Sequence, residues 1–146
     1  MNMWDKIVKT LAAAAGAVMG WWAGLGVMPQ VLAVVMVIDY ATGLMCAWKG
    51  VSPKTESGHV SSKAGFDGLI KKAAIILVVL LALMIDRAIG TNAICAAAMC
   101  FYIANEGVSI LENTALLGVP YPAALKNALE TMRDKGEEKK DEEKKE

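Results

Sequence analysis

PQVLAVVMVIDYATGLMCAW, residues 29–48, contains a single charged side chain, that of Asp39. A helix of about 20 mainly apolar residues crosses the hydrocarbon core of a bilayer, so this stretch predicts a transmembrane helix. Asp39 lies near its midpoint, where an acidic side chain costs about 2.5 to 3.5 kcal/mol. Each strongly apolar neighbour returns only roughly 0.3 to 0.6 kcal/mol. The free energy of inserting this segment alone is therefore close to zero, and we expect it to need helical partners.

Asp39 has two interpretations that its position leaves open. It can face the interior or lumen of a helical bundle as a functional group, or it can be a structural carboxyl group bonded to another helix. Gly43 and Ala47 follow it at four-residue intervals. Residues four apart share one helix face, so this face is predicted to be a packing or oligomerisation surface in either case.

A preceding span is predicted over residues 10–27, separated from the first stretch by a turn at Met28-Pro29-Gln30, because proline ends helices. Small residues recur on it every four positions, which favours close helix packing in lipid. Whether the partner helix belongs to the same chain or to a neighbouring copy stays open, as does whether this segment spans or lies in the interface. The residues of this ladder are Ala12, Gly16, Gly20 and Gly24.

Two further spans are predicted over residues 69–89 and 93–105, after a polar loop over residues 50–68. Lys71 and Lys72 precede the third span's apolar centre and are expected to extend to the membrane interface. Asp86 and Arg87 end that span and are interpreted as an interfacial ion pair. The fold class is thus all-α, a membrane bundle of about four helices.

Residues 106–132 are predicted to be amphipathic and terminal helices, which complete one domain over residues 1–132. In the segment from Ala98 to Asn113, six polar side chains fall on one helical arc. This arc predicts either a lumen lining or a helix on the membrane surface with its polar face in water. Residues 133–146 carry 13 charges in 14 positions and are predicted to be disordered. The polar face comprises Tyr102, Asn105, Glu106, Ser109, Glu112 and Asn113.

Lysine and arginine cluster in the N-terminal segment and the central loop, whereas the other two turns hold one such residue between them. This distribution predicts that both termini and the loop are cytoplasmic. His59 is the only histidine, and the three cysteines have no CxxC spacing. No nucleotide-binding or hydrolase motif occurs, and basic residues are interleaved with acidic ones. We therefore expect neither an enzyme nor a metal, cofactor or nucleic-acid site.

Three ordered segments carry a family likeness: an aspartate with a glycine four residues on and a basic end, a serine-rich loop leading into paired lysines, and a glutamate-serine-asparagine helix before a proline-bracketed turn. The segments are Val37–Gly43 with Ala47-Trp48-Lys49, Ser61–Lys72, and Phe101–Asn113 with Gly118–Pro122. Together they resemble the toxin-secretion and phage-lysis holin family. The resemblance covers about residues 37–132, and the glycine ladder of the first span lies outside it.

The resemblance implies a protein that oligomerises in the bacterial cytoplasmic membrane and forms lesions through which an endolysin or a toxin is released. Two alternatives remain at this stage. An antiholin of the same fold would regulate such lesions, and would itself be a partner of a holin. A small multimeric ion or solute carrier could use Asp39 as a relay, although no internal repeat supports this.

Overall fold

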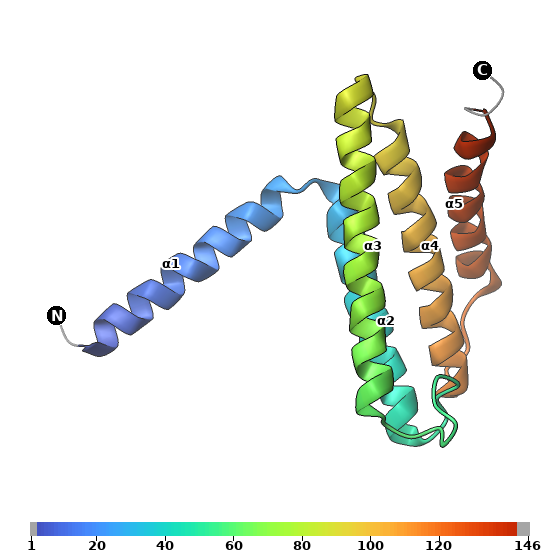
Figure 1. Cartoon of the computed structure of the whole chain (residues 1–146). Helices are drawn as coiled ribbons and strands as arrows, with labels where there is room; N and C mark the ends of the chain where they lie inside the picture. The colour runs from blue at the N-terminus through green and yellow to red at the C-terminus, as the bar shows by residue number, and fades with distance from the viewer. Residues whose placement is uncertain (1–2, 143–146) are drawn as a thin grey trace.

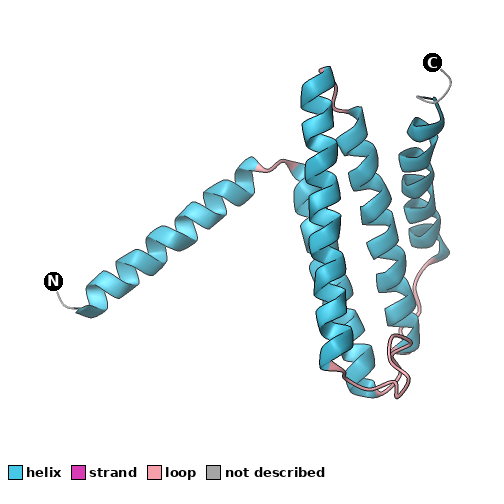
Figure 2. Ribbon diagram, viewed as in Figure 1, coloured by secondary structure: helices cyan, strands magenta, loops and turns pink. Residues whose placement is uncertain are grey.

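The computed structural model describes residues 3–142, which form five α-helices and no strand (Figure 2). They are α1 (Met3–Gly24), α2 (Val27–Lys49), α3 (Ser62–Ile89), α4 (Ala93–Leu116) and α5 (Ala123–Glu142). Helices α2, α3 and α4 run up and down beside one another, α5 lies along α4, and α1 projects away from the bundle (Figure 1). The predicted all-α bundle is confirmed.

Four of the helices, α1 to α4, are long and apolar enough to cross a membrane. Large apolar side chains cover the outer faces of α2 and α3, where they are exposed in the single chain. A water-soluble bundle would bury such residues, so these faces are suited to lipid. The exposed side chains include Val34, Val37, Leu44, Leu77, Leu80, Leu81 and Met84.

The break between α1 and α2 comes earlier than predicted. Gly26 takes a left-handed φ of 79°, which glycine adopts without a steric penalty. Pro29 is the third residue of α2, within the first turn, where a backbone N–H has no helical partner to lose. The predicted turn at Met28-Pro29-Gln30 is therefore the beginning of α2.

Helix α3 begins at Ser62, seven residues before the predicted span, because the Ser61 hydroxyl accepts a hydrogen bond from the N–H of Ala64. Helix α4 is continuous to Leu116, so the predicted span over 93–105 and the amphipathic segment after it form one helix. The end of α2, the start of α3 and the end of α4 lie together at one end of the bundle, with the loop over residues 50–61 (Figure 1). We call this the loop end.

Asp86 lies in the last turn of α3, and its side chain reaches the first turn of α4. Its carboxylate accepts hydrogen bonds from the N–H groups of Ile94, at 3.1 Å, and Cys95, at 2.7 Å, and from the Thr91 hydroxyl. These N–H groups lie in the first turn of α4, which has no helical acceptors of its own. Asp86 is almost completely buried while Arg87 is exposed. The structure therefore gives Asp86 a role that was not predicted, which is capping of α4.

The terminal helix α5 extends to Glu142, ten residues beyond its predicted end at Met132. Lysine and glutamate are good helix formers, and no proline follows Pro122, so the charged segment continues the helix. The predicted disorder therefore differs from the structure over residues 133–142. Residues 143–146 of the predicted tail lie outside the described residues.

The core of the bundle lies between α2, α3 and α4 and combines leucine, isoleucine and methionine side chains with small ones. Methionine adapts to irregular gaps between helices, and the small side chains let the helices approach. The core sits mainly in the half of the bundle away from the loop end, and the other half buries polar side chains such as Asp39 and Asn113 beside apolar ones such as Cys46 and Leu111. Its buried residues are Leu32, Met36, Ile75, Ala82, Cys95, Met99 and Ile103.

Candidate functional site

Three charged residues lie at one depth in the bundle. Asp39 precedes the last residue of α2 by ten positions, Lys72 follows the first residue of α3 by ten, and Glu106 precedes the last residue of α4 by ten. At a rise of 1.5 Å per residue, each is about 15 Å from the loop end. The up-and-down order of the helices therefore brings them to one level, half way across a ~30 Å hydrocarbon core.

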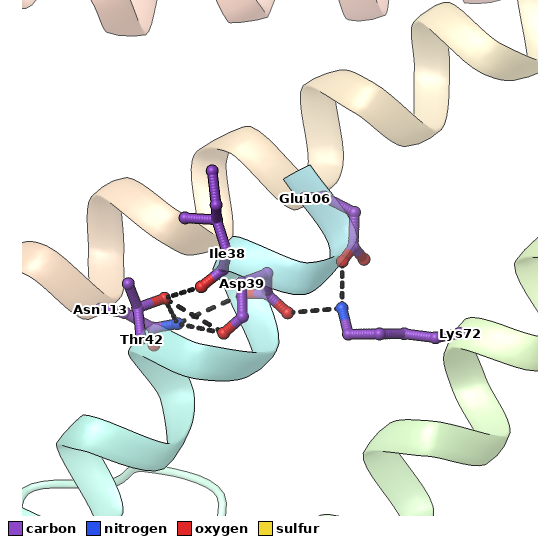
Figure 3. Close-up of polar contacts among 6 residues, drawn as sticks. All are labelled: Ile38, Asp39, Thr42, Lys72, Glu106 and Asn113. Carbon is purple, nitrogen blue, oxygen red and sulfur yellow. Dashed lines mark hydrogen bonds and ion pairs between the residues drawn. The ribbon is translucent and has the colours of Figure 1, made fainter. Parts of the chain in front are cut away.

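Lys72 joins the two carboxylates. Its Nζ lies 2.9 Å from Oδ2 of Asp39 and also donates to Oε2 of Glu106 (Figure 3). The side chains of Asp39, Lys72 and Glu106 are 7%, 13% and 5% exposed. We call these three residues the ion triad. A charge in hydrocarbon is tolerated when it is paired, and here one ammonium serves two carboxylates on two other helices.

Asn113 connects the triad to the neighbouring turn of α2. Its Nδ2 donates to Oδ1 of Asp39 at 3.3 Å and lies 3.1 Å from the Thr42 hydroxyl (Figure 3). Its backbone carbonyl oxygen accepts a hydrogen bond from the Cys46 thiol. Gly43 lies beside these contacts, and a Cβ built on it would be at ordinary contact distance, 3.7 Å, from the Asn113 amide. The polar side chains of α4 therefore hold α2 and α4 together.

A polar cleft with a volume of about 980 Å³ leads from the loop end to the ion triad. It lies between α2, the loop and the first half of α3 on one side and α4 on the other. Hydroxyl, amide and charged groups of both signs line it, so its wall is suited to water rather than to an apolar ligand. Its lining includes Asp39, Lys72, Tyr102, Asn105, Glu106 and Ser109.

The predicted polar face of α4 thus points mainly into the bundle. Glu106 and Asn113 are buried, and Tyr102, Asn105 and Ser109 line the cleft, whereas Glu112 is exposed and lies outside it. The helix itself packs against α2, α3 and α5. Within one chain this face is therefore turned toward the other helices, and whether it lines a lumen between subunits stays a prediction.

Lys72 is the residue of this site that the sequence analysis missed. The prediction placed it at an interface beside Lys71, whereas the structure turns it inward to Asp39. The signal was the equal distance of three charges from the loop end, which becomes visible only once α3 is seen to begin at Ser62. Starting the span at residue 69 put Lys72 at its edge.

The small-residue ladder of α1 meets no other helix among the described residues. Apart from the backbone of α1 itself and the adjacent residues, no described atom lies within 4 Å of a Cβ built on Gly16, Gly20 or Gly24, and Ala12 is exposed. On α2, by contrast, Asp39 and Ala47 are buried and Gly43 is close to α4. The two predicted packing surfaces therefore separate: that of α2 is occupied by α4, and that of α1 is unoccupied within one chain.

Comparison with known proteins gives the family. The profile of the bacteriophage holin family matches residues 13–134, which include all of α2 to α4 and the ion triad. The chain belongs to the bacteriophage holin family. It is 33% identical over 111 residues to a probable holin of Bacillus phage phi105, a match that covers 75% of this chain and 77% of the phage protein. The resemblance found from the sequence is confirmed.

Bacterial relatives cover still more of this holin-family chain. A Halalkalibacterium halodurans protein is 39% identical over 143 residues, or 94% of this chain and 96% of its own length. A Clostridium perfringens protein is 37% identical over 131 residues, or 88% and 94% of the two chains. No solved structure matches. Membership in the holin family points to a non-enzymatic membrane protein that associates with membranes and oligomerises.

Proposed function

We propose that this chain is a holin that oligomerises in the bacterial cytoplasmic membrane and forms lesions through which an endolysin or a toxin passes. The observation that carries the proposal is a polar cleft ending at a buried ion triad, inside a bundle whose outer faces are apolar. Polar and charged side chains at this depth are costly in lipid, so their presence around a cleft favours a function that brings water into it. Membership in the holin family supports the same role.

In this proposal the ion triad holds α2, α3 and α4 together in the closed state. One lysine neutralises one of two carboxylates, and the amide of Asn113 supplies a further donor to Asp39, so the charged groups satisfy one another within a single chain. Opening would require the first half of α3 to part from α2 and α4, because there Lys72 bonds the carboxylates of both. Water entering the cleft would then replace these contacts, and neighbouring subunits would close the lumen.

The unoccupied ladder on α1 supplies a surface for subunit contact. Its small side chains allow a second helix to approach closely, and no other helix in the described part of the chain packs on it. We propose that Gly16, Gly20 and Gly24 meet a neighbouring copy. In the same proposal the loop end and both termini are cytoplasmic, as the distribution of lysine and arginine favours. The cleft then opens toward the side that holds the endolysin or toxin.

Induction of the chain in a bacterial host tests the proposal. Growth, membrane potential and release of a co-expressed cytoplasmic enzyme are followed together, with Gly20→Leu and Asp39→Asn as variants and Glu112→Gln as an exposed control outside the cleft. We expect an abrupt halt of growth, loss of potential and enzyme release, with timing shifted in both variants and not in the control.

Two results would redirect the proposal. A chain that is benign alone and delays lysis by a second holin would be an antiholin. A chain that passes protons or small ions while every cytoplasmic enzyme stays inside would be a carrier. Unchanged timing in both Gly20→Leu and Asp39→Asn would remove the ladder and the triad from the mechanism.

A further inference from the structure

Helices α4 and α5 pack closely at two glycines, Gly107 against the Leu129 side chain and Gly136 against the α4 backbone. A Cβ on Gly107 would lie 2.7 Å from Cδ2 of Leu129, and a Cβ on Gly136 would lie 2.9 Å from the carbonyl oxygen of Ala97. Glycine on each helix thus admits the other. The two helices run side by side over most of their length, with α5 leading away from the loop end (Figure 1).

The charge of α5 conflicts with this position when α4 spans a bilayer. Its described side chains include exposed Lys126, Asp134 and Lys135, and residues 137–142 are all charged in the sequence. Residues 93–105 of α4, alongside, carry no charge. Docked on a spanning α4, α5 would take its charges through hydrocarbon to the side opposite the loop end, and each charge is penalised there. α5 is also not among the helices that could cross a membrane.

We infer that α5 is a removable cover on α4, docked before α4 spans the membrane and released when it does, and that the uncovered face then binds the same face of a second copy. This inference rests on the proposed function. The face already receives a helix at close range, so its shape suits another helix. The α4 helix of a second copy can take the place of α5 within the hydrocarbon core, because residues 93–105 of α4 carry no charge whereas α5 is charged.

Small side chains mark the face in question. Ala97, Cys100, Ala104 and Gly107 recur on one side of α4, away from Glu106 and the cleft, and Ala104 is fully buried. In lipid, close packing of small residues drives helices together, whereas the outer faces of α2 and α3 present large side chains suited to acyl chains. The second copy would therefore bind on the side of α4 opposite the polar cleft.

The release of α5 is tested by labelling the full chain in bacterial membranes. In a variant with Cys46, Cys95 and Cys100 each changed to alanine, Lys135→Cys reports the tail and Ser57→Cys reports the loop. A membrane-impermeant maleimide is added to spheroplasts and to inside-out vesicles. We expect both positions to be labelled from the same, cytoplasmic side. Protection of Lys135→Cys, or labelling from the outer side alone, overturns the release.

The second-copy contact is tested by oxidative crosslinking through Cys100, with Cys46→Ala and Cys95→Ala as the background. Gly136→Leu should clash with the α4 backbone and weaken docking, and Leu129→Ala should weaken it without a clash. We expect several-fold more Cys100-linked dimer in both soon after induction, while part of the chain with intact docking still holds α5 on α4, and no gain in Asn127→Leu, which changes an exposed position of α5. An unchanged dimer yield in both docking variants overturns the contact.

These readouts are independent of lysis. A chain that labels and crosslinks as expected but releases no enzyme would refute the proposed function and leave the cover intact. A chain that lyses cells with α5 protected, or with no gain of Cys100 dimer in either docking variant, would refute the cover and leave the holin function intact.

Discussion

The Nζ atom of Lys72 lies 2.9 Å from Oδ2 of Asp39, although 33 positions separate the two residues in the chain. The same ammonium bonds Glu106 on a third helix. The ion triad therefore has a formal charge of −1 when all three groups are ionised, and every helix of the α2–α4 bundle contributes one member. Removing the cation and removing an anion from such a set are unequal changes.

Lys72→Met should destabilise the bundle strongly. It leaves two carboxylates buried at one level without the ammonium that bonds both, and breaking a buried pair by removing one partner costs about 3 to 5 kcal/mol. Thermal unfolding in detergent, followed by circular dichroism, measures the loss. Lys71→Met is the matched control, since Lys71 is the exposed neighbour on the same helix. Equal stability of the two variants would contradict the triad.

Asp39→Asn should cost less than Lys72→Met. The remaining Lys72–Glu106 pair is then neutral, and the new amide can still bond the Asn113 side chain. We expect the double variant Asp39→Asn/Lys72→Met to regain part of the stability lost in Lys72→Met, because only one carboxylate then lacks a cation. Additive losses in the double variant would show that the two residues do not interact.

Asp86→Ala should loosen the turn between α3 and α4. The N–H groups of Ile94 and Cys95 would lose their acceptor, and loss of a capping side chain costs about 0.5 to 2 kcal/mol. Hydrogen exchange at these two amides, measured in detergent, should accelerate. Arg87→Ala serves as the control, and faster exchange in both variants to the same extent would assign the effect to the surface of the turn.

Gly43→Ala should leave the fold intact or stabilise it. A Cβ there would be 3.6 Å from the Lys54 ammonium and 3.7 Å from the Asn113 amide, which is ordinary contact, and alanine favours helix by up to about 1 kcal/mol over glycine. Gly50→Ala is the contrasting variant, because Gly50 has a φ of 79° and the His59 ring beside it. Unfolding midpoints compare the two. A lower midpoint for Gly43→Ala would mean tighter packing of α2 on α4.

The sequence predicted the helical class and the four spans well, because long uncharged runs have one favourable solution in lipid. Asp39 was expected to need a partner, and Glu106 and Asn113 were placed on one polar face. The partner itself was not found. Choosing Lys72 requires the heights of three helices relative to one another, and the height of α3 depends on where Ser61 begins it.

Local signals misplaced two further features. Asp86 was interpreted together with its neighbour Arg87, because the sequence of one span does not show what its end contacts. In the structure the carboxylate accepts hydrogen bonds from the first turn of the next helix. The charged segment after Met132 was expected to be disordered because it cannot form a core. Composition alone does not show that Gly136 fits against the α4 backbone. In both cases a contact between two helices decided the outcome.

Asn105→Leu tests whether the cleft becomes the lumen. Asn105 lines the cleft near the ion triad without belonging to it, and leucine is a good helix former, so the helix and the membrane level of the chain should persist. An apolar side chain would, however, make the wall harder to wet when subunits assemble. We expect delayed lysis and slower enzyme release at equal protein level in the membrane.

Glu112→Leu is the matched control, because it makes the same change to leucine on the same helix at an exposed position outside the cleft. Its lysis time should shift less than that of Asn105→Leu. If the cleft stays closed and lesions form elsewhere between subunits, the order reverses: an outward position then faces the neighbouring copy, and Glu112→Leu has the larger effect. The ranking of the two lysis times therefore decides which side of α4 meets water.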